Sequence, residues 1–162
     1  MNKFLKKISL IIILQLFLSN SLAQDIDSDI ANAYGEFIEV LNQNISGLKN
    51  GKFCIFGSDE ITNAIILRNN EYIEIKDDLK NIDLCNIAYI ANDKQKTFKF
   101  IGYNFKDLRI LTIATYSGFS LNDSGIIEIQ LGRRNFEIIV NKKTLKANSF
   151  MLKPLINSYV IN

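Results

Sequence analysis

The sequence contains no histidine and no tryptophan, and its 162 residues include one proline and two cysteines. Without histidine the chain cannot form a Ser-His-Asp triad, a Cys-His dyad or a histidine-ligated metal site. Two cysteines are too few for an all-cysteine zinc site, which needs about four ligands. These absences exclude most hydrolase and metalloenzyme mechanisms, and we expect neither a metal nor a cofactor.

The composition is that of one globular domain. Hydrophobic residues make up 48% of the chain and charged residues 22%, which is typical of folded proteins. A chain of this length can bury a core without further crosslinks. We find no internal repeat, linker or low-complexity tract, and we therefore expect one domain over residues 24–162.

Residues 1–23 have the pattern of a secretory signal peptide. A basic start, an apolar run and two small residues follow in order: Lys3, Lys6 and Lys7, then Ile8 to Leu18, then Ser21 and Ala23. The apolar run is shorter than the about 20 residues of a spanning helix. We expect cleavage between Ala23 and Gln24, export to the periplasm, and no membrane insertion afterwards. The alternative is an uncleaved N-terminal anchor.

Removal of the signal changes the charge balance. The remaining residues hold 16 basic and 17 acidic side chains, a net charge of −1. Nucleic-acid binding requires a basic surface that neutralises phosphates. We expect no such surface in the mature chain, and hence no nucleic-acid partner.

Both cysteines, Cys54 and Cys85, lie in the exported part. Cysteine pairs outside the cytoplasm tend to oxidise, and this pair would stabilise the fold by roughly 3–4 kcal/mol. The alternative is two buried free thiols that pack as small hydrophobic side chains. A CxxC motif is absent, so a thioredoxin-like activity is not supported.

The apolar pattern predicts alternating helices and strands. Helices are expected near residues 25–43, 58–67, 93–101 and 141–160, with Pro154 kinking or dividing the last. Strands are expected at residues 52–56, 71–75, 85–90 and 109–114, and a hairpin at 125–131 and 135–140. This order predicts an α/β fold: a mainly parallel sheet flanked by helices in a three-layer α/β/α, Rossmann-like arrangement, with a C-terminal antiparallel hairpin.

Two loops carry candidate partner-binding residues. Tyr116 and Phe119 flank Gly118 after a strand, where exposed aromatics could anchor an interface; alternatively, they tuck under the loop as core. Arg133 and Arg134 follow Gly132 at the hairpin tip. They could bind an acidic partner, or they could form an ordinary exposed turn.

Two other polar segments are better explained by local structure. Gly57, Ser58 and Asp59 follow a strand and open a helix, where an anion could bind, but the segment lacks both glycine-rich phosphate motifs. An ordinary helix N-cap is the simpler interpretation. Asp77, Asp78 and Asp83 lack the spacing of a calcium loop and indicate a solvated loop.

Four segments together resemble the YfiR/HmsC-like family of small exported bacterial proteins. They are FCIFG around Cys54, CNIAYI from Cys85, LTIATYSGFSLNDSGIIEI from Leu111 to Ile129, and NFEIIVNKKTLKANSFMLKPL from Asn135 to Leu155. Three departures are Ala114-Thr115 for the family's Ser-Asp, Ser124-Gly125 for its double glycine, and Asn42-Gln43 in the region of its Trp-Pro. Because these departures fall in loops and at a helix end, they concern the partner surface more than the fold.

The resemblance implies a disulfide between Cys54 and Cys85 and a role in signalling. Members of the family bind the periplasmic sensor domain of an inner-membrane diguanylate cyclase and hold it inactive, which lowers cyclic-di-GMP and restrains biofilm growth. They are not enzymes, and they tend to form homodimers. We expect the same of this chain.

Two other functions stay open. A periplasmic module that binds a small ligand would need a pocket at the carboxyl ends of the parallel strands. An enzyme with a Ser/Lys or carboxylate site would need a concave site where strongly perturbed groups converge.

Overall fold

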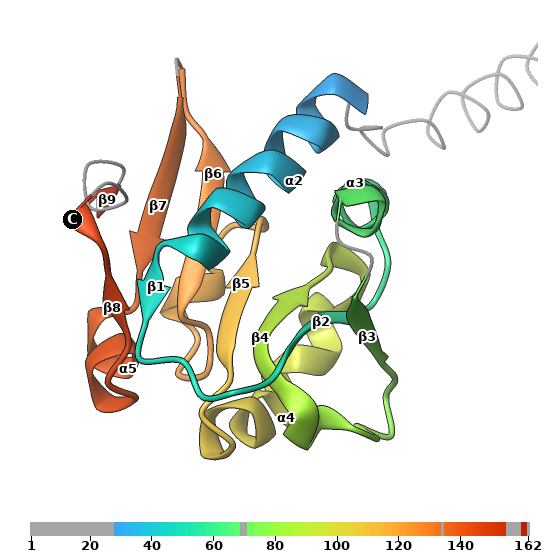
Figure 1. The fold of residues 1–162 in the computed structure, drawn as a ribbon, viewed down its shortest axis with the longest axis vertical. Coiled ribbons are helices and arrows are strands. Elements are labelled where there is room, and N and C mark those ends of the chain that lie inside the picture. The colour runs from blue at the N-terminus through green and yellow to red at the C-terminus, as the bar shows by residue number, and fades with distance from the viewer. Residues whose placement is uncertain (1–27, 69–70, 134, 155–159, 162) are drawn as a thin grey trace, which may run out of the picture.

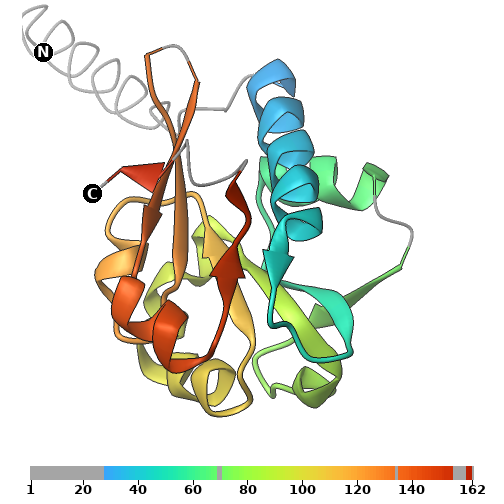
Figure 2. The same ribbon diagram turned by 60° about the vertical axis from the view of Figure 1, so that its left-hand side comes forward.

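The computed structural model describes residues 28–68, 71–133, 135–154 and 160–161 (Figures 1 and 2). Its α-helices are α2 (Ser28–Gln43), α3 (Glu60–Arg68), α4 (Gln95–Asp107) and α5 (Lys142–Ala147). Its strands are β1 (Ile45–Ser46), β2 (Lys52–Phe56), β3 (Tyr72–Ile75), β4 (Cys85–Ile90), β5 (Leu111–Ala114), β6 (Ile127–Leu131), β7 (Phe136–Val140), β8 (Met151–Leu152) and β9 (Val160–Ile161). Short 3₁₀ turns are η1 (Ile82–Leu84), η2 (Asn92–Lys94) and η3 (Phe119–Leu121). The signal peptide and its cleavage site, Ala23-Gln24, lie outside the described residues.

The main sheet has the strand order β3-β2-β4-β5-β6-β7-β9. Neighbours from β3 to β6 are parallel, β6 and β7 form an antiparallel hairpin, and β9 is parallel to β7. Strands β1 and β8 form a separate antiparallel pair. The predicted α/β fold with a C-terminal hairpin is confirmed, and the bounds of β2 and β4 are those the sequence predicted.

Helices cover both faces of the sheet (Figure 1). Along β4, Ile87 and Tyr89 face the layer of α2 and α3, whereas Ala88 and Ile90 face the layer of α4. Such alternation is what a strand imposes when both of its faces are buried. It produces two apolar clusters, one on each side of the sheet, and hence the three-layer arrangement.

The C-terminal helix predicted over residues 141–160 is wrong in extent. Asn141 caps α5 by accepting a hydrogen bond from the backbone N–H of Thr144 at 3.0 Å, but the helix ends at Ala147. Ser149 then adopts a left-handed conformation with φ of 61°, and Phe150, 3% exposed, enters the core. Strand β8 lies between α5 and Pro154, so Pro154 is not inside α5.

The pairing of β8 with β1 explains why the helix stops there. The backbone of Gly47, with φ of 85°, approaches the carbonyl of Ser149 so closely that a Cβ would lie 2.2 Å from that oxygen. Only glycine fits at this approach. The apolar pattern of residues 145–156 matched a helix. Residues 151–152 nevertheless form a strand, because they pair with β1, about one hundred residues earlier in the chain.

Candidate functional site

The loop between β5 and β6, residues 115–126, lies over the α4 face of the sheet and holds the predicted aromatic pair. Phe119 is 1% exposed, and its ring centroid lies 5.2 Å from that of Phe98 on α4. Phe119 is therefore part of the core under the loop, which was the second of the two expectations, and it is not an exposed interface anchor. Tyr116 is half-buried and meets Phe119 edge to face at 5.2 Å.

The same loop carries an exposed residue that the sequence analysis missed. Leu121 is 87% exposed, directly after the buried Phe119 and Ser120. A single exposed leucine gives no periodic signal in a loop, because loops have no fixed period. It is the most exposed large apolar side chain among the described residues.

Glu128 on β6 binds the backbone of this loop through hydrogen bonds. Its side chain, 1% exposed, accepts hydrogen bonds from the backbone N–H of Gly118 at 3.2 Å and from the N–H and hydroxyl of Ser120 at 3.1 and 2.9 Å. The side-chain amide of Gln130 donates a further bond. A buried carboxylate is tolerated only when it is bonded in this way.

Glu128 was also absent from the sequence analysis, although its strand contains a signal for it. It stands between Ile127 and Ile129 in an otherwise apolar strand. Alternation places it on the face opposite to these two isoleucines, which is the face that the loop covers. Gly118, with φ of 81°, allows the loop to turn its N–H toward the carboxylate.

Burial and the nearby Glu128 charge raise the pKa of Tyr116. The phenol therefore stays neutral at physiological pH and can donate a hydrogen bond. It offers no anionic nucleophile or base to an enzyme.

A second polar cluster joins the carboxyl ends of β2, β4 and β5. Asp59 accepts hydrogen bonds from the buried Tyr89 hydroxyl at 3.0 Å and from the N–H of Asn92 at 2.9 Å. Its other oxygen accepts from the backbone N–H and hydroxyl of Thr62, at 2.8 and 2.9 Å, which caps α3. The N-cap interpretation of this segment is confirmed.

Tyr89 is held inside this cluster. Its hydroxyl lies 3.2 Å from that of Thr115, and the residue is fully buried. Burial, followed by the charge of Asp59, raises the pKa of Tyr89. Among the described residues no buried side-chain nitrogen or oxygen lacks a hydrogen-bond partner, so these groups serve each other.

The hollow at these strand ends is small. It has a volume of about 80 Å³ and is lined by Asp59, Glu60, Ile61, Asn92, Thr115 and Tyr116. Sites for small molecules usually occupy about 300–1,000 Å³. The position is where a ligand would bind in an open α/β sheet, but the space does not favour the small-ligand alternative.

A larger hollow lies between α2 and the β6–β7 hairpin. Its volume is about 480 Å³, and it is lined by Asp29, Ile30, Ala33, Phe37, Leu131, Asn135 and Phe136. Leu131, at its rim, is 50% exposed. Arg133, at the hairpin tip beside it, is exposed, while Arg134 lies outside the described residues.

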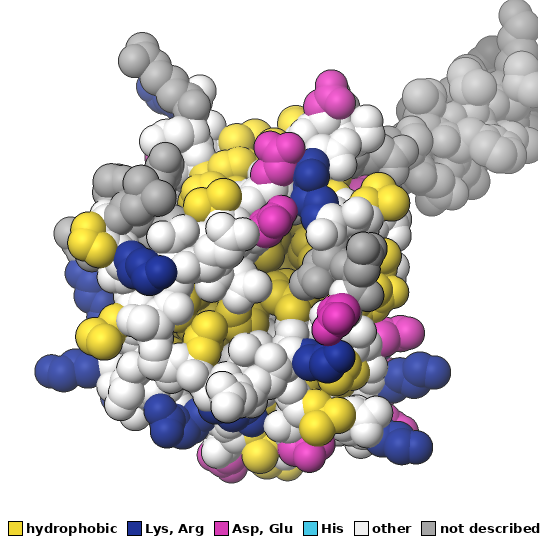
Figure 3. Space-filling view, in the orientation of Figure 1, with side chains coloured by type: hydrophobic (Ala, Val, Ile, Leu, Met, Phe, Trp, Pro, Cys, Tyr) yellow, Lys and Arg dark blue, Asp and Glu magenta, His cyan; other side chains and the backbone are white. Residues whose placement is uncertain are grey.

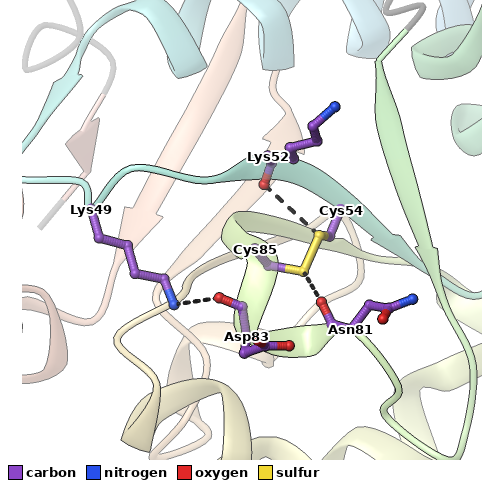
Figure 4. Close-up of a disulfide and its surroundings, with 6 residues drawn as sticks. All are labelled: Lys49, Lys52, Cys54, Asn81, Asp83 and Cys85. Atoms are coloured by element: carbon purple, nitrogen blue, oxygen red, sulfur yellow. Dashed lines mark hydrogen bonds between the residues drawn. A yellow bond between two sulfur atoms is a disulfide. The ribbon is translucent and has the colours of Figure 1, made fainter.

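Cys54 and Cys85 are joined by a disulfide with a Cα–Cα distance of 5.7 Å (Figure 4). It links β2 to the first residue of β4, and both cysteines are fully buried. Beside it, the Lys49 amine donates a hydrogen bond to the carbonyl of Asp83 at 3.2 Å. The disulfide thus ties the start of β4 to the neighbouring strand on the α4 side of the sheet.

The described part of the chain lacks three further features. No three His, Cys, Asp or Glu residues there gather in a way that could hold a metal ion. None of its helices is long and apolar enough to cross a bilayer. It also contains no free cysteine.

Fold and site together define a disulfide-linked α/β domain whose buried polar groups bond to each other. The YfiR/HmsC-like family matches residues 34–156. The chain belongs to this family, which is known for regulators of diguanylate cyclases and is periplasmic. Comparison with curated proteins found no significant match.

Proposed function

We propose that the chain is a periplasmic regulatory protein that binds the periplasmic domain of an inner-membrane diguanylate cyclase and inhibits it. The observation that carries the proposal is family membership over residues 34–156. The internal bonding of Asp59, Tyr89 and Glu128 supports a binding role over catalysis, because each group is already occupied. By this proposal the chain is not an enzyme.

Inhibition requires only that the regulator prefers one conformation of its partner. A ligand shifts a two-state equilibrium by its difference in affinity for the two states. A preference of about 3–5 kcal/mol would keep almost all of the cyclase in its inactive state. No chemical step at the regulator is needed.

We place the partner surface at the turn end of the β6–β7 hairpin. The exposed Arg133 stands at the tip, and the half-exposed Leu131 borders the apolar hollow against α2. An apolar centre with a charged rim is a usual arrangement of protein interfaces. Arg134 is included in this surface by its position in the sequence. Tyr116 keeps a secondary role as a half-exposed loop residue.

The test is in-cell crosslinking with a photoreactive residue at position 131. We expect it to capture an inner-membrane diguanylate cyclase through its periplasmic domain, whereas the same probe at Lys76, beside β3, should not. Arg133→Glu should weaken the capture and raise cyclic-di-GMP relative to the unmodified protein. Equal capture from positions 131 and 76, or capture of no cyclase by either, would refute the proposal.

Export and assembly belong to the same proposal. We expect mass spectrometry of the exported protein to find Gln24 at its N-terminus. We also expect light scattering to find a homodimer. A chain that keeps residues 1–23, or one that stays monomeric, would contradict these two parts separately.

A further inference from the structure

Charge is divided unequally between the two halves of the chain. Residues 24–93 hold five basic and 13 acidic side chains, while residues 94–162 hold 11 basic and four acidic ones. The two halves cancel in the net charge. The expectation that the mature chain builds no basic surface was drawn from that net charge, which does not describe how the charges are distributed on the folded chain.

Tertiary contacts bring much of the positive half together. Helix α5 lies against the β5–β6 loop, because the Thr144 hydroxyl donates a hydrogen bond to the carbonyl of Asp123 at 3.1 Å. It also lies against the turn that follows α4, because Arg109 donates to the carbonyl of Asn148 at 2.9 Å. Both ribbon views place α5 beside the end of α4 at the lower end of the sheet (Figures 1 and 2).

We call the result the basic face. Its exposed cationic side chains are Lys99, Lys106, Arg109, Lys142, Lys143 and Lys146, and two exposed acidic residues, Asp107 and Asp123, lie on the same segments. In Figure 3, Lys and Arg side chains lie along the left and lower left margin, over the region of α5, and others lie at the lower right, with acidic side chains between them at the lower margin. Lys99, Lys106 and Lys146 form no ion pair with any described residue.

Exposed apolar side chains adjoin the basic face. Phe100 and Tyr103 on α4 are 79% and 59% exposed, and Leu121 is 87% exposed. The loop of Leu121 runs beside α4, since a Cβ at Gly102 would lie 2.8 Å from the Cβ of Ser124. Three large apolar groups therefore project among lysines.

We propose that the basic face, with Tyr103 and Leu121 as its apolar contacts, binds the surface of a membrane that contains anionic phospholipid. Clustered Lys and Arg side chains are attracted to anionic headgroups, and aromatic side chains favour the interface. These apolar groups project from the surface, so they can enter the headgroup layer. A protein partner would instead offer pockets for them, as interface anchors require.

This orientation is compatible with the proposed function but independent of it. The tip of the β6–β7 hairpin lies at the opposite end of the molecule from α5 (Figure 1). A chain seated on lipid through its basic face would therefore direct Arg133 away from the bilayer. Lipid binding is measured without any cyclase, so one proposal can fail while the other holds.

The experiment is flotation of the exported protein with lipid vesicles. Its N-terminus is first checked by mass spectrometry, because the apolar residues 8–18 would themselves bind lipid. We expect binding to vesicles of phosphatidylcholine mixed with phosphatidylglycerol, little binding to pure phosphatidylcholine, and weakening by added salt. Lys99→Glu with Lys143→Glu should lower the affinity by at least about tenfold.

Two matched controls complete the test. Lys76→Glu with Lys80→Glu changes the net charge equally at exposed positions that follow β3, the edge strand farthest from β9, and should retain most of the binding. Tyr103→Ser with Leu121→Ser should weaken binding, whereas Leu67→Ser with Met151→Ser, also exposed, should not. Circular dichroism and thermal melts verify that each variant is folded.

Several results would overturn the proposal. One is equal binding to neutral and anionic vesicles; another is equal loss in both lysine pairs. A third is absence of vesicle binding at low salt. A fourth is that the basic face binds a second copy of the chain instead of lipid. In that case the protein would form a dimer that Lys99→Glu with Lys143→Glu dissociates, and it would not bind vesicles.

Discussion

The carboxylate of Glu128 accepts hydrogen bonds from both the backbone N–H and the hydroxyl of Ser120, at 3.1 and 2.9 Å. The two residues lie eight positions apart, on β6 and in the preceding loop. This contact fixes the segment in which Phe119 points inward and Leu121 points outward. The exposed surface of the loop therefore depends on a residue buried beneath it.

Glu128→Gln should destabilise the protein by about 2 kcal/mol, because it replaces one acceptor oxygen with a donor that faces other donors. Hydrogen exchange of residues 117–121 should accelerate by more than that of β4. Urea unfolding and exchange mass spectrometry measure both effects. Glu39→Gln on the exposed face of α2 is the control, and equal effects from the two variants would argue against a specific role of Glu128.

Phe119→Ala should lower the free energy of unfolding by about 3–5 kcal/mol, because it removes a fully buried ring. Leu121→Ser, two positions later, should change it by less than about 0.5 kcal/mol. Denaturant titration of both variants tests the assignment. Similar losses in the two would mean that Leu121 is buried in solution.

Replacing both Cys54 and Cys85 with alanine should cost roughly 3–4 kcal/mol, because the disulfide closes a loop with a sequence separation of 31 residues. Reductant should lower the melting temperature of the unmodified protein and leave that of the double variant unchanged. Thermal melts with and without reductant measure this. A melt of the unmodified protein that is insensitive to reductant would indicate free thiols.

Asp59→Ala should cost about 2–3 kcal/mol, because it removes the cap of α3 and leaves the Tyr89 hydroxyl with one partner fewer. Ser58→Ala, at the exposed neighbouring position, is the matched control and should have little effect. Urea unfolding of both gives the difference. If only Ser58→Ala lowered the free energy of unfolding, the assignment of Asp59 as the cap of α3 would be wrong.

Stability should fall at alkaline pH. Burial raises the pKa of Tyr34, Tyr89 and Tyr116 in the folded state, whereas the unfolded chain ionises near pH 10. Below about pH 10 both states are protonated and stability is unaffected. Above it only the unfolded state releases protons, so stability declines as the pH rises.

Ultraviolet titration of the tyrosines checks this prediction. The protein has six tyrosines, and the three named should ionise at a higher pH than tyrosines of the unfolded chain. Tyr89→Phe should remove one late-ionising group from the curve. Ionisation of all tyrosines in one step near pH 10 would contradict the burial of these phenols.

Most elements of the sheet could be predicted from the sequence because their signals are local. The runs at 52–56 and 85–90 are short and largely apolar, and they became β2 and β4 unchanged. The predicted end of the last helix failed because residues 151–152 pair with β1, a contact no local pattern contains. The same difference applies to the site residues. Asp59 could be predicted as a helix cap from its neighbours in the sequence. The role of Glu128 could not, because it depends on the loop that covers its side of the sheet.

The sequence by itself determined the α/β class and the resemblance to the family, since hydrophobic period, residue type and ordered motifs are properties of the chain. The tertiary structure decided which side chains are exposed. Phe119 and Leu121 are both apolar loop residues, and packing against α4 alone separates them. It also decided the basic face, because net charge is a sum over residues, whereas a surface potential depends on where the folded chain places them.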